Sequence, residues 1–528
     1  MRRAFSSPCF TLPFVVRGLI AAGALLGSLG VLAAGCSLGN LAHDDCKDDA
    51  QCGALFGLGS TCSEGFCSDP AVCTTGHECR KAAGGGACVM GACQAAFPLD
   101  DACKAIVEPP DLLSRPAVGE GAPLVIGGIF SLDESKNAAL TVAIRLAVKD
   151  INRTGGMKAG QKLGVVFCNN SKPGVVSAEE RLQRNNHALD YLAGTLGVPV
   201  IIGPLTSAES IQLITRVKEK AYPTVIISPS ATSPNLTGAD DRLRPEDKHG
   251  LFWRTCPSDL LQGKVLAQQI PEMTGNVAVV YIKDAYGEGL ATVFRESYNN
   301  FKLSLAFPIE AADLDSPMKL AAVAAKVNAY APGAVVVITT TGVETINVIK
   351  ELAKLPVGTK PFFFTDGAKD SKILLDPALP PAVITLIKGA RGTAPASPSG
   401  KNYATLETNL KEAGLDPASY SFLAQSYDAT MIGALGIIAA SKVDTKYDGL
   451  DVADGLAHLS AGKAIDLNPT DWLNGVGELT KAGQINVEGT SGSLNFDPVT
   501  GEAPGKIEIW RASDDFTSFT NVTTVDPP

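Results

Sequence analysis

Polar loops follow the short apolar runs in the middle of this chain, and their side chains could recognise a small charged molecule. The run that ends at Ile202 is followed by GPLTSA (203–208), and the run that ends at Ile227 is followed by SPSATSP (228–234). Both segments combine hydroxyl groups with backbone N–H groups at the start of a helix. Such groups bind anions, so these two loops predict a site for a carboxylate or a similar group.

Two further loops carry the opposite chemistry. The run that ends at Ile282 is followed by KDAYGEG (283–289), and the run that ends at Phe364 is followed by TDG (365–367). Carboxylates and a phenol suit a cation such as an ammonium group. A receptor for an anion beside a receptor for a cation matches a zwitterion, so the four loops together indicate a small amino acid as the ligand.

Cysteines are crowded near the N-terminus: nine of the 13 lie between Cys46 and Cys103. Eight of them form a duplicated pattern, with steps of 6, 10 and 5 residues in the first copy and 6, 9 and 5 in the second. The window contains no C-x2-C pair and is rich in Gly, Ser and Asp, which favours disulfides over zinc. The pairing is left open by the sequence. The disulfide candidates are Cys46, Cys52, Cys62, Cys67, Cys73, Cys79, Cys88 and Cys93.

Three cysteines outside this pattern, Cys103, Cys168 and Cys256, leave an odd number in the exported protein. One thiol is therefore free, or one disulfide joins two domains. A Cys168–Cys256 disulfide within the large domain is one way to pair two of them.

The N-terminus has the order of an export signal. Arg2, Arg3 and Arg17 precede or begin an apolar run that ends in small residues directly before Cys36. This order is typical of secretory signals, and the cysteine resembles the lipidated residue of bacterial lipoproteins. We expect a lipid on Cys36 to attach the protein to a membrane, at the periplasm or the cell surface. A plain cleaved signal and an uncleaved anchor are the alternatives, and all three place the mature protein outside the cytoplasm.

The elements that must position the polar loops are alternating strands and helices. The predicted strands are rich in Val and Ile and apolar on both faces, as buried parallel strands are. Ligands bind beyond the carboxyl ends of such strands. About 400 residues are too many for one sheet, so we expect an α/β fold with two lobes. The strands are expected at 124–130, 163–167, 198–202, 224–227, 277–282, 334–338 and 361–364, and the helices at 138–151, 178–192, 208–220, 260–268, 289–299 and 344–355.

The expected domains are a signal peptide at 1–35, a duplicated cysteine-rich module at 36–107, a proline-rich linker at 108–122 and a two-lobed ligand-binding domain at 123–528. The chain has 528 residues, 45% of them hydrophobic, and a net charge of −10. This composition excludes a mainly disordered chain and argues against nucleic acid as a partner. None of the five histidines lies in a nucleophile or metal motif, and no phosphate-binding G-x4-G-K-[ST] motif is present. We therefore expect no enzyme activity, no cofactor and no metal.

Several segments together resemble the type 1 periplasmic binding proteins of the branched-chain amino-acid (leucine, isoleucine and valine) class. They are AVKDIN (147–152), 202–207, 228–237, WRT (253–255), 279–290 and 492–497. The resemblance implies two lobes joined by a hinge, with a ligand in the cleft between them. It also implies delivery of that ligand to the permease subunits of an ABC importer.

The resemblance further implies roles for individual residues. Ser207 and Thr232 would hold the ligand carboxylate together with the backbone at Ser230 and Ala231, and Asp366 would pair with its ammonium. Tyr286 would line the closing side of the cleft, Phe422 would face the body of the ligand, and Thr341 stands near the position of a family tyrosine. The acidic loop at 131–135 suggests a polar or basic ligand side chain. Ser207 and Thr232 are also ordinary helix caps, Asp366 suits a turn, and the two aromatic residues suit packing.

The function expected from the sequence is therefore capture of a small amino-acid-like ligand by a membrane-anchored solute-binding protein. The alternatives are a ligand-sensing receptor component with a separate signalling partner, and a surface scaffold whose cysteine module carries the function.

Overall fold

The computed structural model describes residues 46–68, 71–119, 121–172, 178–299, 301–396, 398–443 and 446–526. The expected signal peptide and the lipidation site at Cys36 lie outside these residues. None of the helices described is long and apolar enough to cross a membrane.

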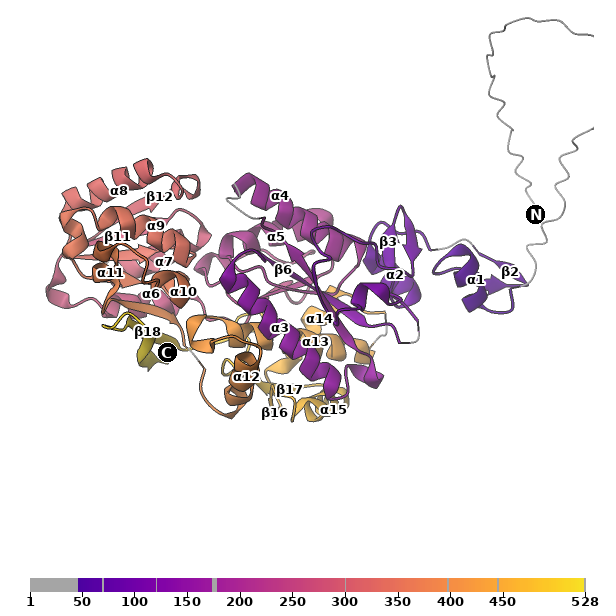
Figure 1. The fold of residues 1–528 in the computed structure, drawn as a ribbon. Helices are drawn as coiled ribbons and strands as arrows, with labels where there is room; N and C mark the ends of the chain where they lie inside the picture. The colour runs from indigo at the N-terminus through magenta and orange to yellow at the C-terminus, as the bar shows by residue number, and fades with distance from the viewer. Residues whose placement is uncertain are drawn as a thin grey trace, which may run out of the picture. The chain divides into compact units, whose positions relative to one another are not determined.

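The first lobe is built on a six-stranded sheet with the order β10–β9–β8–β6–β7–β5. Figure 1 labels its strand β6. All neighbouring strands are parallel except β5, which runs antiparallel to β7. The next strand in sequence after β6 is β7, which lies on one side of β6, and the following strand, β8, lies on its other side. The order in which strands are added to the sheet therefore reverses between β6 and β8. The strands are β5 (Ile106–Glu108), β6 (Leu124–Phe130), β7 (Leu163–Asn169), β8 (Val200–Ile202), β9 (Val225–Ser228) and β10 (Phe252–Arg254).

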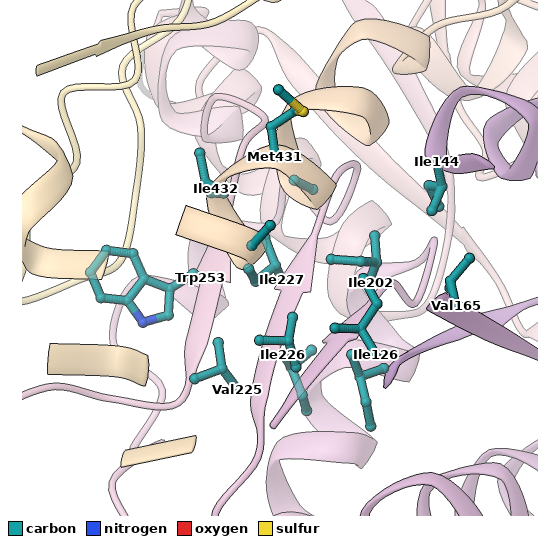
Figure 2. Packing of buried hydrophobic residues seen from close by; sticks show 14 of the residues in the cluster. Ile126, Ile144, Val165, Ile202, Val225, Ile226, Ile227, Trp253, Met431 and Ile432 are labelled. Carbon is teal, nitrogen blue, oxygen red and sulfur yellow. The ribbon is translucent and has the colours of Figure 1, made fainter. Parts of the chain in front are cut away.

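Both faces of this sheet are covered, which explains why its strands are apolar throughout. Val200 and Ile202 approach Gly433 of α13, whereas Ile201 approaches Gly127 and Leu192 on the other face. Helix α13 lies against β8 and β9, and Figure 2 shows the part of it that carries Met431 and Ile432 together with labelled isoleucines of the sheet. The covering helices are α3 (Ser135–Arg153), α4 (Ala178–Leu189), α5 (Ser207–Lys220), α13 (Leu423–Val443) and α14 (Gly449–Leu456).

The second lobe is built on a seven-stranded sheet with the order β12–β11–β13–β14–β15–β18–β19. Alternate residues of β11 enter two separate apolar clusters. Val277 and Val279 pack with residues of α6 and α7, while Ala278 and Val280 pack with residues of α8 and α9. The strands are β11 (Val277–Ile282), β12 (Ser304–Ile309), β13 (Ala334–Ile338), β14 (Phe362–Phe364), β15 (Arg391–Pro395), β18 (Ile507–Ala512) and β19 (Phe519–Val525); the helices are α6 (Asp259–Gln268), α7 (Ala285–Ser297), α8 (Pro317–Tyr330) and α9 (Gly342–Leu352).

These two sheets confirm the predicted two-lobed α/β fold. Several helices begin earlier than predicted because polar side chains cap them. Asp284 accepts a hydrogen bond from Gly287 N at 2.8 Å and begins α7, and Thr341 forms a capping box with Glu344 and begins α9. The remaining elements are α10 (Ser371–Leu374), α11 (Pro381–Ile387), α12 (Lys401–Glu412), α15 (Trp472–Ala482), β16 (Lys463–Asp466) and β17 (Ile485–Glu488).

The chain passes between the lobes three times, after β10, after β15 and before β18. Two of these connections lie close together, those that contain Pro257 and Gly505. A Cβ atom added to Gly505 would lie only 2.9 Å from Pro257 Cβ. Arg254, at the end of β10, is fully buried and donates to the carbonyls of Ala231 and Ser233, both at 2.9 Å. The polar loop after β9 is thereby fixed to the start of the first connection.

The cysteine module is cross-linked as predicted, and the two copies share one pairing. The first cysteine of each copy bonds to the third and the second to the fourth. The disulfides are Cys46–Cys62, Cys52–Cys67, Cys73–Cys88 and Cys79–Cys93. The elements of the module are α1 (Asp49–Phe56), β1 (Cys62–Ser63), β2 (Phe66–Cys67), α2 (Gly76–Ala83), β3 (Ala87–Val89) and β4 (Ala92–Gln94).

A fifth disulfide corrects one expectation: Cys168 bonds to Cys103, and the suggested Cys168–Cys256 disulfide is wrong. Cys103 lies beside the end of β7, where Asn169 N donates to Ala102 O at 2.8 Å. Cys256 is a buried free thiol whose Sγ lies 3.5 Å from Ala231 O. The odd cysteine count is thus explained by one free thiol and one bond between module and lobe.

The second copy of the module is packed against the first lobe. Arg80 donates from two nitrogens to Gly197 O, at 3.2 and 3.1 Å. The segment 108–122, expected to be a linker, begins inside β5 and places Leu112 against Gly164 of β7. This segment is therefore packed on the sheet over part of its length.

Candidate ligand-binding site

A small cavity lies where the two lobes meet, and both lobes supply its walls. The first lobe contributes six of its nine residues and the second lobe three. They are Lys136, Leu205, Thr206, Ser207, Ser230 and Phe422, and Tyr286, Thr340 and Asp366. Five of the residues singled out from the sequence are among them: Ser207, Ser230, Tyr286, Asp366 and Phe422.

The topology explains why these residues meet. Lys136 and Ser207 follow β6 and β8, the two strands between which the first sheet reverses its direction of growth. Tyr286 and Thr340 follow β11 and β13, which hold the same position in the second sheet. Crevices of this kind, outside the carboxyl ends of strands at a reversal point, are where α/β proteins bind ligands.

The loop before α5 offers donors to an anion. Thr206 caps the helix, since its Oγ1 accepts from Glu209 N at 3.2 Å and donates to Glu209 Oε2 at 2.9 Å. Ser207 Oγ accepts from Ser233 N at 3.1 Å, so its own hydroxyl proton remains available to donate into the cavity. Ser230 Oγ donates to Leu205 O at 2.7 Å and can only accept from a ligand.

Three predicted site residues are not brought to the cavity. Thr232 is buried, and its hydroxyl donates to Asp259 Oδ2 at 2.9 Å. Ala231 N donates to Ser228 Oγ at 3.0 Å. Thr341 caps α9, while its neighbour Thr340 lines the cavity instead.

Asp366 supplies the negative charge of the second lobe. Its Oδ1 accepts from Gln262 Nε2 and lies the same 2.7 Å from Tyr286 Oη, and Tyr286 Oη also lies 2.8 Å from Thr365 Oγ1. Burial and the charge of Asp366 raise the pKa of Tyr286, so the phenol keeps its proton. Asp366 is thus held by two donors on one oxygen.

A second acid, Asp259, lies fully buried at the start of α6. Burial, reinforced by the charge of Asp366, raises the pKa of Asp259 well above the usual range. Its Oδ1 has no hydrogen-bond partner among the residues described. Asp259 does not line the cavity, so Asp366 is the acid that a ligand there would meet.

The cation of the cavity is Lys136, a residue that the sequence interpretation missed. It lies in the first turn of α3, it is 7% exposed, and its Nζ lies 5.1 Å from the centre of the Phe422 ring. Burial lowers the pKa of Lys136, while the carboxylates of Asp366, Asp370 and Glu134 act in the opposite direction. Its position in the sequence could have pointed to it, because Lys136 directly follows the polar loop at 131–135.

The cavity has a volume of about 20 Å³, which is room for one water molecule. An amino acid does not fit without movement. The lobes must therefore separate to admit a ligand of that size, and the three connections between them are where such a movement would occur.

Two lobes, touching connections and a polar cavity between the lobes define a ligand-binding protein of the type 1 periplasmic class. Residues 139–515 match the family described as the receptor family ligand binding region, and the chain belongs to this family.

Curated relatives match only a part of the chain. A Leu/Ile/Val-binding protein of Rhizobium johnstonii is 30% identical over 174 residues, which cover 32% of this chain and 39% of that protein. A leucine-, isoleucine-, valine-, threonine- and alanine-binding protein of Pseudomonas aeruginosa is 28% identical over 163 residues, covering 30% and 38%. The matches thus span about two fifths of the length of these relatives.

Solved structures share the fold over nearly their whole length. A leucine binding protein, LivK, of Thermotoga maritima aligns with a TM-score of 0.57 at 18% identity, covering 76% of this chain and 99% of that one. A solute binding protein of an ABC transporter from R. palustris, in complex with benzoate, aligns with a TM-score of 0.55 at 16% identity, covering 77% and 97%.

Proposed function

We propose that this protein is an exported solute-binding protein that captures a small carboxylate-bearing, amino-acid-like molecule between its lobes and delivers it to an ABC importer. The observation that carries the proposal is the cavity at the reversal points of both sheets, where donors from one lobe face a carboxylate from the other. The names of the curated relatives, which refer to leucine, isoleucine and valine, support a ligand of amino-acid size.

The mechanism follows from the placement of these groups. The ligand carboxylate accepts from Ser207 Oγ and from the N–H groups at the start of α5 while the lobes are apart. Closure then brings Tyr286, Thr340 and Asp366 onto the ligand from the second lobe. Ligand binding favours the closed form because contacts with both lobes exist only there. A permease that recognises the closed surface would receive only loaded protein.

Export and anchoring belong to the same proposal. Five disulfides suit an oxidising compartment. A lipid on Cys36 would hold the protein at a membrane, and the cysteine module would stand between that lipid and the lobes.

The test uses the exported full-length chain carrying Cys36→Ser, which prevents lipid attachment. Its melting temperature is measured against amino acids, small carboxylates, amides and sugars, because a ligand that binds only the folded state raises Tm. Ser207→Ala should weaken the best ligand by about tenfold or more, the usual effect of losing a hydrogen bond to a charged group. Ser210→Ala is the matched control, since Ser210 lies on the same helix but donates to Thr206 O at 2.9 Å. A panel without any stabilising compound would contradict the proposal.

A further inference from the structure

The amino group of Lys136 is buried without a hydrogen-bonded protein partner. None of the ion pairs or hydrogen bonds found among the described residues includes its Nζ, which lies 5.1 Å from the centre of the Phe422 ring. The carboxylates of Asp366, Asp370 and Glu134 act on its charge without a direct bond. A buried charge is costly unless it is paired, and a cation–π contact offsets only part of that cost. Lys136 lines the cavity, so a bound anion is the partner that its position admits.

The same ammonium is unfavourable for a ligand that carries an ammonium of its own. The second group of the cavity with a full charge is Asp366, whose Oδ1 already has two donors at 2.7 Å. Lys136 and Asp366 line the same cavity, so a ligand ammonium beside Asp366 would face the Lys136 ammonium across it. Like charges that face each other in a site that excludes water repel more strongly than they do in bulk water. The charge of Lys136 therefore disfavours a ligand that carries an amino group, as a zwitterion does.

The groups that remain suit a carboxylate with an uncharged body. The Ser207 hydroxyl is free to donate, and the apolar parts of Leu205 and Phe422 line the same space. We propose that Lys136 makes this cleft selective for organic carboxylates that lack an α-ammonium group, by pairing with the ligand carboxylate and repelling an amino group. This inference rests on the proposed function, because it assigns the ligand of the same cavity.

Matched pairs of probes test the inference directly. Isothermal titration of the Cys36→Ser protein compares 4-methylpentanoate with L-leucine, propanoate with L-alanine, phenylacetate with L-phenylglycine, and glutarate with L-glutamate. Each pair differs in the ammonium group alone. We expect the plain carboxylate to bind at least tenfold more tightly in every pair that binds at all.

Variants then assign this preference to one side chain. Lys136→Met keeps the apolar stem and should weaken carboxylate binding at least tenfold, while the amino acid of the same pair is unchanged or strengthened. Lys136→Arg should retain the preference. The matched control is Lys372→Met, because Lys372 also lies over an aromatic ring, Tyr420 at 5.7 Å, but is exposed and outside the cavity lining.

The outcomes separate this inference from the function on which it rests. Tighter binding of an amino acid than of its plain carboxylate would overturn the inference and leave the proposed function standing. L-glutamate preferred over glutarate would do the same and would indicate that Lys136 pairs with a side-chain carboxylate. No binding by either member of any pair would overturn both.

Discussion

At the residue scale, His77 joins the second copy of the cysteine module to the first lobe. Its Nε2 lies 2.9 Å from Thr224 Oγ1, and its Nδ1 has no hydrogen-bond partner among the residues described. Burial, together with the positive charges of Arg80 and Lys81, lowers the pKa of His77 to about 3. Protonation of the ring would place an unpaired cation in the contact between module and lobe.

This pKa shift predicts that acid weakens the contact. An unfolded histidine titrates near 6.5, above the folded value, so the stabilisation is complete above pH 6.5 and is lost as the pH falls toward 3. At pH 5 the expected loss is about 2 kcal/mol. The measurement is Tm and hydrogen exchange of the α2 amides between pH 8 and 5. His77→Gln should flatten the pH dependence, whereas His458→Gln, at an exposed position, should not. Equal slopes in both variants would show that another group is responsible.

Some residues of the candidate site could be recognised from the sequence and others could not. Polar residues after apolar runs identified Ser207, Tyr286 and Asp366, because strand ends determine which loops can meet. Lys136 was missed because it lies between the loop considered at 131–135 and the helix predicted at 138–151, whereas α3 begins at Ser135. The Thr232 hydroxyl is bonded to Asp259, 27 residues further along the chain, and a sequence does not show such a partner.

At the scale of elements, the Cys103–Cys168 disulfide joins the end of the module to β7. It closes a loop of 65 residues, the longest among the five disulfides. Replacing both cysteines by alanine should lower the free energy of unfolding by about 4 kcal/mol, because the unfolded chain regains the freedom of a long loop. Removing Cys46–Cys62, which closes a loop of 16 residues within the module, should affect the lobes little. Calorimetric unfolding of both variants tests this, and equal destabilisation of the lobes would contradict it.

Elements differed in how readily the sequence revealed them. The strands β6, β11 and β13 were predicted with their observed ends, because buried parallel strands are continuous apolar runs between polar loops. The strand β10 has the sequence FWR and ends in an arginine, so it is not part of a Val- and Ile-rich run, and β12 mixes buried and exposed residues. The antiparallel strands β18 and β19 join a sheet whose other strands lie over a hundred residues earlier, and local periodicity carries no information on that pairing.

At the scale of the whole molecule, the small cavity and the contacts around it indicate a closed arrangement of the lobes. Ser135 Oγ donates to Asp370 Oδ2 at 3.3 Å, and Ser233 Oγ donates to Ala285 O at 2.6 Å, so both contacts bridge the lobes beside the cavity. A ligand larger than one water molecule enters only when these contacts break. We therefore expect opening about the connections at Pro257 and Gly505 to be a step of binding that slows association of the ligand.

A disulfide across the cleft should make that step visible. The side chains of Ser135 and Asp370 come within 3.3 Å of each other from opposite lobes, so we choose Ser135→Cys with Asp370→Cys for cross-linking. The oxidised double variant should bind the best ligand of the panel at least tenfold more slowly than the reduced one, because the locked lobes keep the entrance shut. Stopped-flow fluorescence measures the rates. The single variant Asp370→Cys is the control for the loss of a negative charge near Lys136. A second control, the unsubstituted protein in the same mild reductant, shows whether the five native disulfides survive. Equal association rates in the locked and reduced forms would mean that the ligand reaches its site without separation of the lobes.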